Sequence, residues 1–338
     1  MVGETLYVFS RRDGDEVLTA LDAATGAERW RTGYAAPFTP SKPAAAHGAG
    51  PKATPVFHDG KVFTLGISGI VAAFDAATGK LLWRTEAPAE PPFFSAAASP
   101  VADGSLVLTH PGNYGPLTAF DSETGQVKWT AGKDGFFQAP LIVDLDSVRQ
   151  VVTVTQGSVS GISLPDGRLL WEFPYPGGSG GTMPVAYGRS IILSALDKGT
   201  TCIRPARQDG RWVVSQVWHT TEVSMYISNP VIAGDTLVGL SRRASGQLFS
   251  IDARSGTVLW LGPPREAENI AFSKAGDLLF MLKDSAELLI ARGTPQAVLQ
   301  RYTVADTPTW AQPVISGNRI FVKDAGSLTL WTVDDELK

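Results

Sequence analysis

The sequence is poor in residues that would point to a metal centre, a disulfide framework or a membrane anchor. Its single cysteine, Cys202, cannot form an internal disulfide, and no CxxC pair or Cys/His cluster occurs. The four histidines, at positions 47, 58, 110 and 219, lack metal-ligand spacing such as HExxH. The longest apolar runs, such as residues 278–282, are far shorter than the ~20 residues that span a bilayer. We therefore expect no disulfide, no metal site and no transmembrane segment.

Charge is also scarce. Charged residues make up 18% of the 338 residues, the net charge is −4, and no run of lysine or arginine occurs. A nucleic-acid-binding protein would show a basic patch or stripe, so we expect no nucleic-acid partner. The apolar fraction of 43%, with 35 glycines and 23 prolines, is typical of many short strands joined by turns and unlike that of a disordered chain.

An internal repeat is the strongest signal in the chain. The clearest copies, each with a glycine four positions before its final tryptophan, are LTALDAATGAERW (18–30), VAAFDAATGKLLW (71–83), LTAFDSETGQVKW (117–129), GISLPDGRLLW (161–171) and LFSIDARSGTVLW (248–260). Weaker copies end at Trp218 and Tyr302. The aromatic residues that end successive copies are 53, 46, 42, 47, 42 and 42 residues apart. A spacing near 42 is the period expected of a four-stranded propeller blade.

A second shared stretch, of the form Pro-Val-x-x-Gly, precedes most copies and marks a strand followed by a turn. Strands that follow such turns lie near residues 4, 61, 105, 151, 190, 236, 278 and 319, which indicates eight units. In the Asp-x-x-Thr-Gly turns, the aspartate can accept backbone N–H bonds and the glycine can take a positive φ. We interpret these aspartates as turn residues rather than metal ligands, and the tryptophans as plugs between blades rather than cofactor platforms. The prediction is an all-β, eight-bladed β-propeller of four-stranded antiparallel blades, in a single domain over residues 1–338.

The first and last blades are expected to be incomplete. Residues 1–8 match the middle of later repeats, and the final stretch, SLTLWTVDDELK, stops before a fourth strand. The first ten residues also lack the charged and apolar regions of a signal peptide. We expect a longer natural form that supplies the missing strands and an export signal, because an unpaired strand edge invites aggregation.

The repeat resembles that of the pyrroloquinoline-quinone-like propeller family over nearly the whole chain. That family includes the quinoprotein alcohol dehydrogenases and the lipoprotein subunit of the bacterial outer-membrane β-barrel assembly machine. The resemblance implies the fold and a periplasmic or extracellular location, but not an activity, because the same propeller hosts enzymes and scaffolds. For the dehydrogenases it implies adjacent cysteines and acidic metal ligands beside the quinone, whereas this chain has only Cys202 and lacks their long inserts. We expect no cofactor, and pyrroloquinoline quinone is suggested by the family name alone.

The candidate binding site comes from departures from the repeat. The loop at 33–55 stretches the first spacing to 53 residues and carries His47 and Lys52, which could contact an anion beside glycines that allow close approach. The equivalent connections of other blades carry polar or aromatic residues that we expect to ring one mouth of the channel: Ser99, Gln138, Thr182, Tyr226, Asn229, Asn269, Trp310 and Gln312. A plain solvent loop and a water-lined ring are the alternative interpretations.

The specific hypothesis is that the 33–54 loop folds over this mouth and brings His47 and Lys52 towards Tyr226, Asn229, Asn269 and Trp310. A small anion or a sugar-like ligand would suit such a mixture of aromatic walls and polar groups. No carboxylate pair or Ser-His-Asp order can be argued from the spacing, so we name no catalytic residue.

The sequence favours a monomeric, non-catalytic binding or scaffold protein whose small-molecule ligand or protein partner binds at the channel-mouth face. One alternative is an enzyme with residues in the channel, either a reduced quinoprotein dehydrogenase or a hydrolase or lyase. The other is an envelope protein-assembly platform that uses exposed blade edges and loops.

Overall fold

The structure, a computed structural model, describes residues 1–90, 92–112, 114–133, 135, 137–176, 180 and 182–333, without the side chains of Pro43, Ala46 and His47. The described residues form eight separate antiparallel sheets, each built from strands that are consecutive in the chain. Two short 3₁₀ helices, η1 (Lys42–His47) and η2 (Arg243–Ser245), interrupt the strands. The predicted fold class, an all-β, eight-bladed β-propeller, is confirmed. No helix among the described residues is long and apolar enough to cross a membrane.

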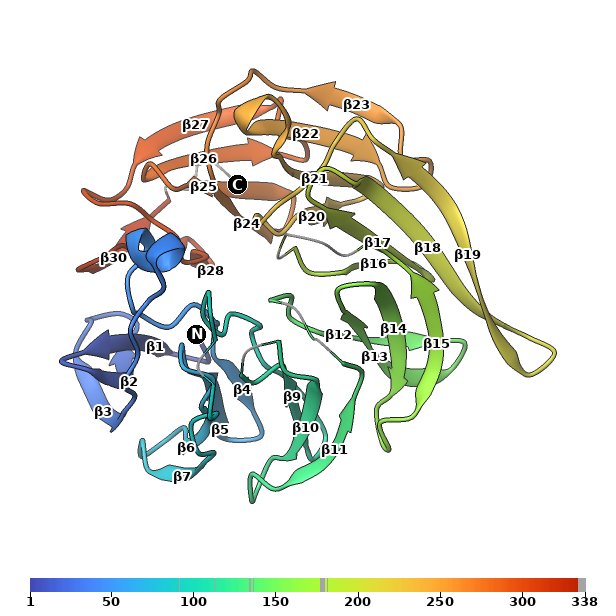
Figure 1. The fold of residues 1–338 in the computed structure, drawn as a ribbon. Coiled ribbons are helices and arrows are strands. Elements are labelled where there is room, and N and C mark those ends of the chain that lie inside the picture. The colour runs from blue at the N-terminus through green and yellow to red at the C-terminus, as the bar shows by residue number, and fades with distance from the viewer. Residues whose placement is uncertain are drawn as a thin grey trace. The chain divides into compact units, whose positions relative to one another are not determined.

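The chain divides into two compact units, Met1–Tyr175 and Pro176–Lys338, and each holds four sheets (Figure 1). The single domain expected from the sequence stays a prediction. The sheets of the first unit contain the strands β1 (Thr5–Arg12), β2 (Asp15–Asp22), β3 (Glu28–Ala35); β4 (Val56–His58), β5 (Lys61–Leu65), β6 (Val71–Asp75), β7 (Leu81–Arg84); β8 (Val101–Asp103), β9 (Leu106–Thr109), β10 (Leu117–Asp121), β11 (Val127–Ala131); β12 (Leu141–Leu145), β13 (Val148–Val154), β14 (Ser158–Ser163) and β15 (Leu169–Pro174).

The second unit also holds four sheets whose strands are consecutive in the chain. Its sheets contain the strands β16 (Val185–Tyr187), β17 (Ser190–Ala195), β18 (Gly199–Gln208), β19 (Arg211–Thr220); β20 (Val231–Ala233), β21 (Thr236–Ser241), β22 (Gln247–Asp252), β23 (Val258–Leu261); β24 (Ile270–Ala275), β25 (Leu278–Lys283), β26 (Glu287–Arg292), β27 (Val298–Thr303); β28 (Val314–Ser316), β29 (Arg319–Lys323) and β30 (Leu328–Thr332).

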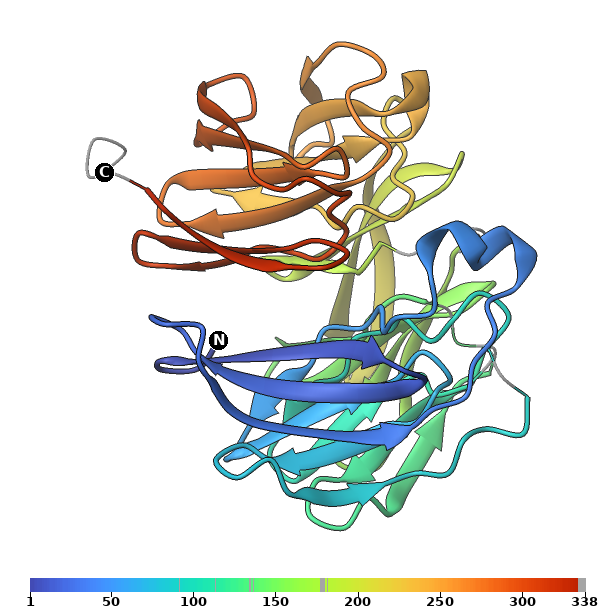
Figure 2. The ribbon, with the colours of Figure 1, turned by 90° about the vertical axis from the view of Figure 1, so that its left-hand side faces the viewer.

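The first and last sheets have three strands in the described part of the chain, and the other six have four. Figure 2 shows the three strands of the first sheet running side by side. The strands expected after the eight Gly turns begin at residues 5, 61, 106, 148, 190, 236, 278 and 319. The repeat therefore predicted the positions of all eight blades along the chain correctly.

The Asp-x-x-Thr-Gly turns have the structure expected of them. Asp22 Oδ1 accepts hydrogen bonds from the backbone N–H of Ala24 at 3.1 Å and of Thr25 at 2.9 Å. Asp75 and Asp121 accept the equivalent bonds in the next two blades. The glycine that ends the turn has a positive φ in each case, which a residue with a side chain rarely adopts.

Four repeat tryptophans pack against the next blade as predicted, namely Trp30, Trp83, Trp129 and Trp218, whereas Trp171 Nε1 donates to Gln150 Oε1 of its own blade. Trp30 Nε1 donates to the carbonyl of Ala76 in the next blade at 3.2 Å, and Trp129 Nε1 donates to the carbonyl of Leu164 at 3.1 Å. The turn glycine of the next blade lies under each ring, so a Cβ on Gly167 would come within 2.7 Å of Trp129. This contact is a second reason for glycine at the turn, beyond its backbone conformation.

Burial of these rings is less complete than the sequence suggested. Trp171 and Trp218 are buried, but Trp30 and Trp129 are half-buried, and Tyr302 is 43% exposed. All of these residues lie on the end strand of their sheet, so position on the end strand leaves some rings partly exposed while Trp171 and Trp218 remain buried.

Candidate functional site

Several residues assigned to the channel mouth form hydrogen bonds between the connections of successive blades. The backbone N–H of Thr54 donates to Ser99 Oγ at 2.9 Å, and the backbone N–H of Met183 donates to Asn229 Oδ1 at 2.8 Å. Ser99 and Asn229 both stand directly before the proline that opens a blade. Each side chain therefore links its own blade to the one before it.

The same link recurs further along the second unit. Ser228 Oγ donates to Asn269 Oδ1 at 2.7 Å, and Gln312 Nε2 donates to the carbonyl of Phe272 at 2.8 Å. Ser99, Asn229 and Gln312 stand directly before a proline, whereas Ser228 lies one residue earlier and Asn269 precedes Ile270. These contacts have a structural role, and we call them the inter-blade latch. Sequence reasoning did not foresee the latch because the bonded groups are about 40 or more residues apart. A ligand-binding role for the same residues stays a prediction.

The other residues that we expected around the channel mouth differ in how exposed their side chains are. Thr182 is buried and donates from its hydroxyl to the carbonyl of Ser194 at 2.9 Å, and Gln138 is also buried. Tyr226 and Trp310 are exposed. Only the two aromatic side chains of this group are therefore presented to a partner as large apolar surfaces.

The long first connection contains helix η1, which His47 ends, and Lys52 follows it with an exposed side chain. The side chain of His47 lies outside the described residues. The loop belongs to the first unit, whereas Tyr226, Asn269 and Trp310 belong to the second. Convergence of the two groups on one pocket stays a prediction.

An exposed aromatic cluster in the first unit was missed by the sequence analysis. Phe93 and Phe94 are 51% and 39% exposed. Their rings pack edge to face, with 4.8 Å between the ring centroids. The ring of Phe94 also packs against that of Phe137, with 5.9 Å between the centroids, and the rings of Phe137 and Tyr114 have centroids 5.8 Å apart. Three different loops, at 85–100, 110–116 and 132–140, thus contribute to one patch, which we call the Phe93 cluster. The adjacent Phe-Phe pair in a Pro-rich loop was the sequence signal for it.

The backbone holds Phe93 and Phe94 outward. Pro92 on one side and Ser95 and Ala96 on the other are buried. The backbone N–H of Ala96 donates to the carbonyl of Ile67 at 3.0 Å, and Ser95 has a φ of +118°, which is strained for a residue with a side chain. Both phenylalanines therefore project from a segment that is anchored at its two ends.

Exposed aromatic rings of this kind are costly in water and are typical of protein-binding surfaces. Burying a Phe side chain on contact contributes about 1.5–3 kcal/mol. Aromatic residues also dominate the energetic hot spots of protein interfaces. Because the segment is held in place beforehand, little conformational entropy is lost when a partner binds. The arrangement fits binding of an apolar protein surface.

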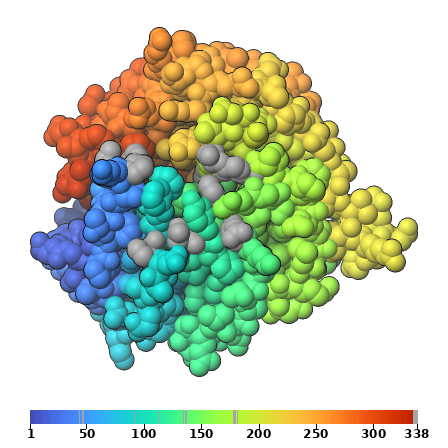
Figure 3. Space-filling view, viewed as in Figure 1, coloured from blue at the N-terminus to red at the C-terminus, as the bar shows by residue number. Residues whose placement is uncertain are grey.

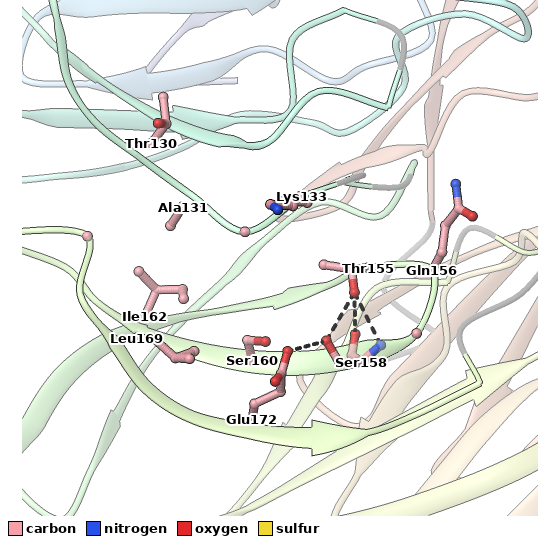
Figure 4. Close-up of a pocket in the computed structure, with 13 residues that line it drawn as sticks. Thr130, Ala131, Lys133, Thr155, Gln156, Ser158, Ser160, Ile162, Leu169 and Glu172 are labelled. Atoms are coloured by element: carbon pink, nitrogen blue, oxygen red, sulfur yellow. Dashed lines mark hydrogen bonds between the residues drawn. The ribbon is translucent and has the colours of Figure 1, made fainter.

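A groove of about 560 Å³ lies between the third and fourth blades of the same unit. Figure 4 shows Thr130, Ala131 and Lys133 on one side, facing Ile162 and Leu169 across the groove. Ser158 Oγ donates to Glu172 Oε1 at 2.8 Å on the second side. Lys133 and Glu172 have opposite charge, so the groove does not select an anionic or a cationic ligand.

The described residues do not match the quinone site that the resemblance implies for the dehydrogenases. Cys202 is buried in β18, and burial raises the pKa of its thiol to about 11. No group of three or more His, Cys, Asp or Glu side chains in the described part of the chain could hold a metal ion. We therefore derive no chemical step through a quinone.

Comparison with known proteins gives the family. The sequence profile described as outer membrane protein assembly factor BamB matches residues 14–262. A protein of that name from Shewanella oneidensis is 26% identical over 253 residues, which cover 70% of this chain and 62% of the relative. The homologue from Yersinia pestis is 26% identical over 223 residues, 61% of this chain and 55% of the relative. The chain thus spans little more than half the length of the curated relatives it matches.

Solved structures share the fold. BamB from Moraxella catarrhalis has a TM-score of 0.68 and 16% identity, covering 98% of this chain and 97% of that one. Quinohemoprotein alcohol dehydrogenase from Comamonas testosteroni has a TM-score of 0.65 and 14% identity, covering 95% of this chain and 69% of that one. At such identities the likeness shows the fold alone, which an assembly factor and an alcohol dehydrogenase have in common.

The resemblance to the pyrroloquinoline-quinone-like propellers is confirmed by these findings. The family profile extends from the first blade to the sixth, well over half of the chain. The chain therefore belongs to the family of outer membrane protein assembly factor BamB.

Proposed function

We propose that this protein is a non-catalytic, monomeric scaffold of the bacterial envelope that takes part in the assembly of outer-membrane proteins without a quinone or metal cofactor. The carrying observation is the family match over residues 14–262, and the named relatives support it. The periplasmic location is part of the same proposal.

The Phe93 cluster supplies the surface through which such a scaffold would bind a protein partner. Its rings are exposed, mutually packed and anchored by buried neighbours. Glu86 and Glu90 are exposed on the same loop as Phe93, and Lys133 is exposed on the 132–140 loop, so the loops carry both charges. A partner surface that is apolar at its centre would complement the patch.

The test of the function is genetic. Deleting the gene in the source bacterium is expected to lower the amount of folded β-barrel proteins in its outer membrane, and a plasmid copy is expected to restore it. Heat-modifiable migration of the barrel proteins on gels measures the folded fraction. Unchanged levels of folded barrel proteins after deletion would overturn the proposed function.

The test of the surface uses two matched pairs of substitutions. Phe93→Ser with Phe94→Ser should abolish restoration while leaving the melting temperature unchanged, because both rings are exposed. The control is Leu259→Ser with Leu261→Ser, two residues of β23 that are 54% and 41% exposed. This variant should fully restore the amount of folded barrel proteins. Full restoration by the double Phe variant would exclude the Phe93 cluster as the docking surface and leave the scaffold function standing.

A further inference from the structure

The hairpin of β18 and β19 extends beyond its blade. Each strand has ten residues, but β17 pairs with β18 only from Gly199 to Ile203. The pairing of β18 with β19 continues from there to Gln208 and Arg211. Residues 204–215 therefore form a two-stranded projection, which we call the ribbon. It is the yellow hairpin that projects at the right of Figure 1 and of the space-filling view in Figure 3.

The turn at the tip of the ribbon determines which backbone groups face outward. Asp209 and Gly210 have φ values of +49° and +77°, the pattern of a two-residue type I′ turn. In such a hairpin the flanking pair, here Gln208 and Arg211, exchanges backbone hydrogen bonds. Hydrogen-bonded and non-hydrogen-bonded pairs then alternate along the ladder.

This alternation makes Pro205 and Val214 a non-hydrogen-bonded pair. The assignment suits Pro205, which has no N–H to donate. The N–H and C=O of Val214 therefore point away from β18, as do those of Trp212 and Gln216, which are two residues to either side. Because β19 is the end strand of its sheet in the described part of the chain, these groups lie along a free edge there. A free edge of this kind is a template for an added strand.

One face of the ribbon is basic and partly apolar. Arg211 and Val213 share this face by alternation along β19, and Arg204 joins it as the register partner of Ser215. Val213 is 43% exposed, and both arginines are exposed. Arg204 Nε donates to Ser190 Oγ, and no ion pair among the described residues joins either arginine to a carboxylate. On a chain of net charge −4, these features make the ribbon a local basic site.

We infer that the free edge of β19, from Trp212 to Gln216, binds an extended acidic segment of a partner protein as an additional β-strand. The backbone groups of the edge supply the hydrogen bonds, Arg204 and Arg211 attract the acidic side chains, and Val213 contacts an apolar residue between them. A lipid surface is disfavoured because the tip, residues 208–210, is polar and carries the carboxylate of Asp209. The inference rests on the proposed function in naming a protein partner.

The test is a titration of the full chain into a fluorescein-labelled peptide, about eight residues long, in which glutamate, valine and glutamate stand at alternate positions with serine between them, so that all three face the same side of the added strand. Fluorescence anisotropy should rise with the wild type, and the matched lysine–valine peptide should bind at least about tenfold more weakly. Val214→Pro should abolish binding, because it removes an outward N–H without breaking a bond to β18. Val214→Thr keeps that N–H and is the matched control. Equal binding by the proline and threonine variants would overturn the inference.

A second pair of measurements does not depend on the proline substitution. The double variant Arg204→Gln and Arg211→Gln should weaken peptide binding by about tenfold or more at low salt, with no change in melting temperature. Sedimentation with phosphatidylglycerol vesicles tests the competing partner: binding of the wild type to vesicles but not to the peptide would overturn the inference in favour of lipid. Peptide binding needs only the purified chain, so its failure is distinguishable from the failure of the gene-deletion test.

Discussion

Replacing the buried Glu16 by alanine should lower the free energy of unfolding by about 2–5 kcal/mol. Glu16 lies on β2 and is fully buried, and its two carboxylate oxygens accept hydrogen bonds from the next blade and from β3. The donors are the backbone N–H of Ile67, at 2.5 Å, and the hydroxyl of Tyr34, at 3.0 Å. Each donor left unsatisfied costs about 1–3 kcal/mol. The carboxylate also fills the space over Gly66, where an added Cβ would come within 1.9 Å of it, so its removal leaves a void.

Glutamine at the same position separates shape from charge. Its amide keeps the size of the side chain and can accept from Ile67 and donate to Tyr34, so Glu16→Gln should cost less than about 1 kcal/mol at low pH. Burial raises the pKa of the Glu16 carboxyl above its usual value of 4.5, against the opposing effects of these two hydrogen bonds and of the Arg11 charge. The folded chain therefore binds this proton more tightly than the unfolded chain does.

The raised pKa of Glu16 makes the stability of the chain depend on pH. The contribution of Glu16 to stability is fully present below pH 4.5 and is lost as the pH rises through the raised folded-state pKa. The glutamine variant has no proton to lose, so it should gain stability relative to the wild type as the pH rises from about 4 to about 8. Urea unfolding of both proteins across this range measures the difference, in which the shared titration of all other groups cancels. A difference that is constant with pH would refute the account of Glu16.

Three further predictions concern the blades. Trp129→Ala should lower the free energy of unfolding by about 3–5 kcal/mol through the cavity it leaves, whereas Trp129→Phe should cost only about 1–2 kcal/mol; an unchanged urea midpoint for the alanine variant would contradict the packing role. Gly167→Ala should cost about 1–3 kcal/mol from its φ of +70° and its clash with Trp129, and more than Gly188→Ala, which has a positive φ but open space around it. Asn229→Ala and Gln312→Ala should each lower the melting temperature by the equivalent of about 1 kcal/mol, and two unchanged melting temperatures would argue against the inter-blade latch.

The repeat could be recognised from sequence because its determinants are local. A carboxylate such as Asp22 bonds to the N–H groups two and three residues ahead of it, and Gly26 takes its positive φ within the same turn. These interactions depend only on neighbouring residues, so their spacing along the chain gave the number of blades and the positions of their strands. The tryptophan plug could be inferred as well, although the contact between Trp129 and Gly167 needed the register of two blades.

The candidate site was harder to predict from the sequence, because its contacts join separate blades. Asn229 and Gln312 looked like channel-lining ligands, and only the fold showed that they bond to backbone groups one blade away. The Phe93 cluster gathers rings from three loops, which no spacing rule brings together.

The ribbon also shows what the sequence alone leaves open. The sequence determined that the unit ending at Trp218 is long, since it follows the preceding copy by 47 residues rather than 42. Only the tertiary structure decided where the extra residues go. Strand β17 ends its pairing at Ile203, and the hairpin continues alone with a free edge and exposed arginines. Local turn chemistry is encoded within a few residues, but exposure and edge pairing depend on what the rest of the chain leaves uncovered.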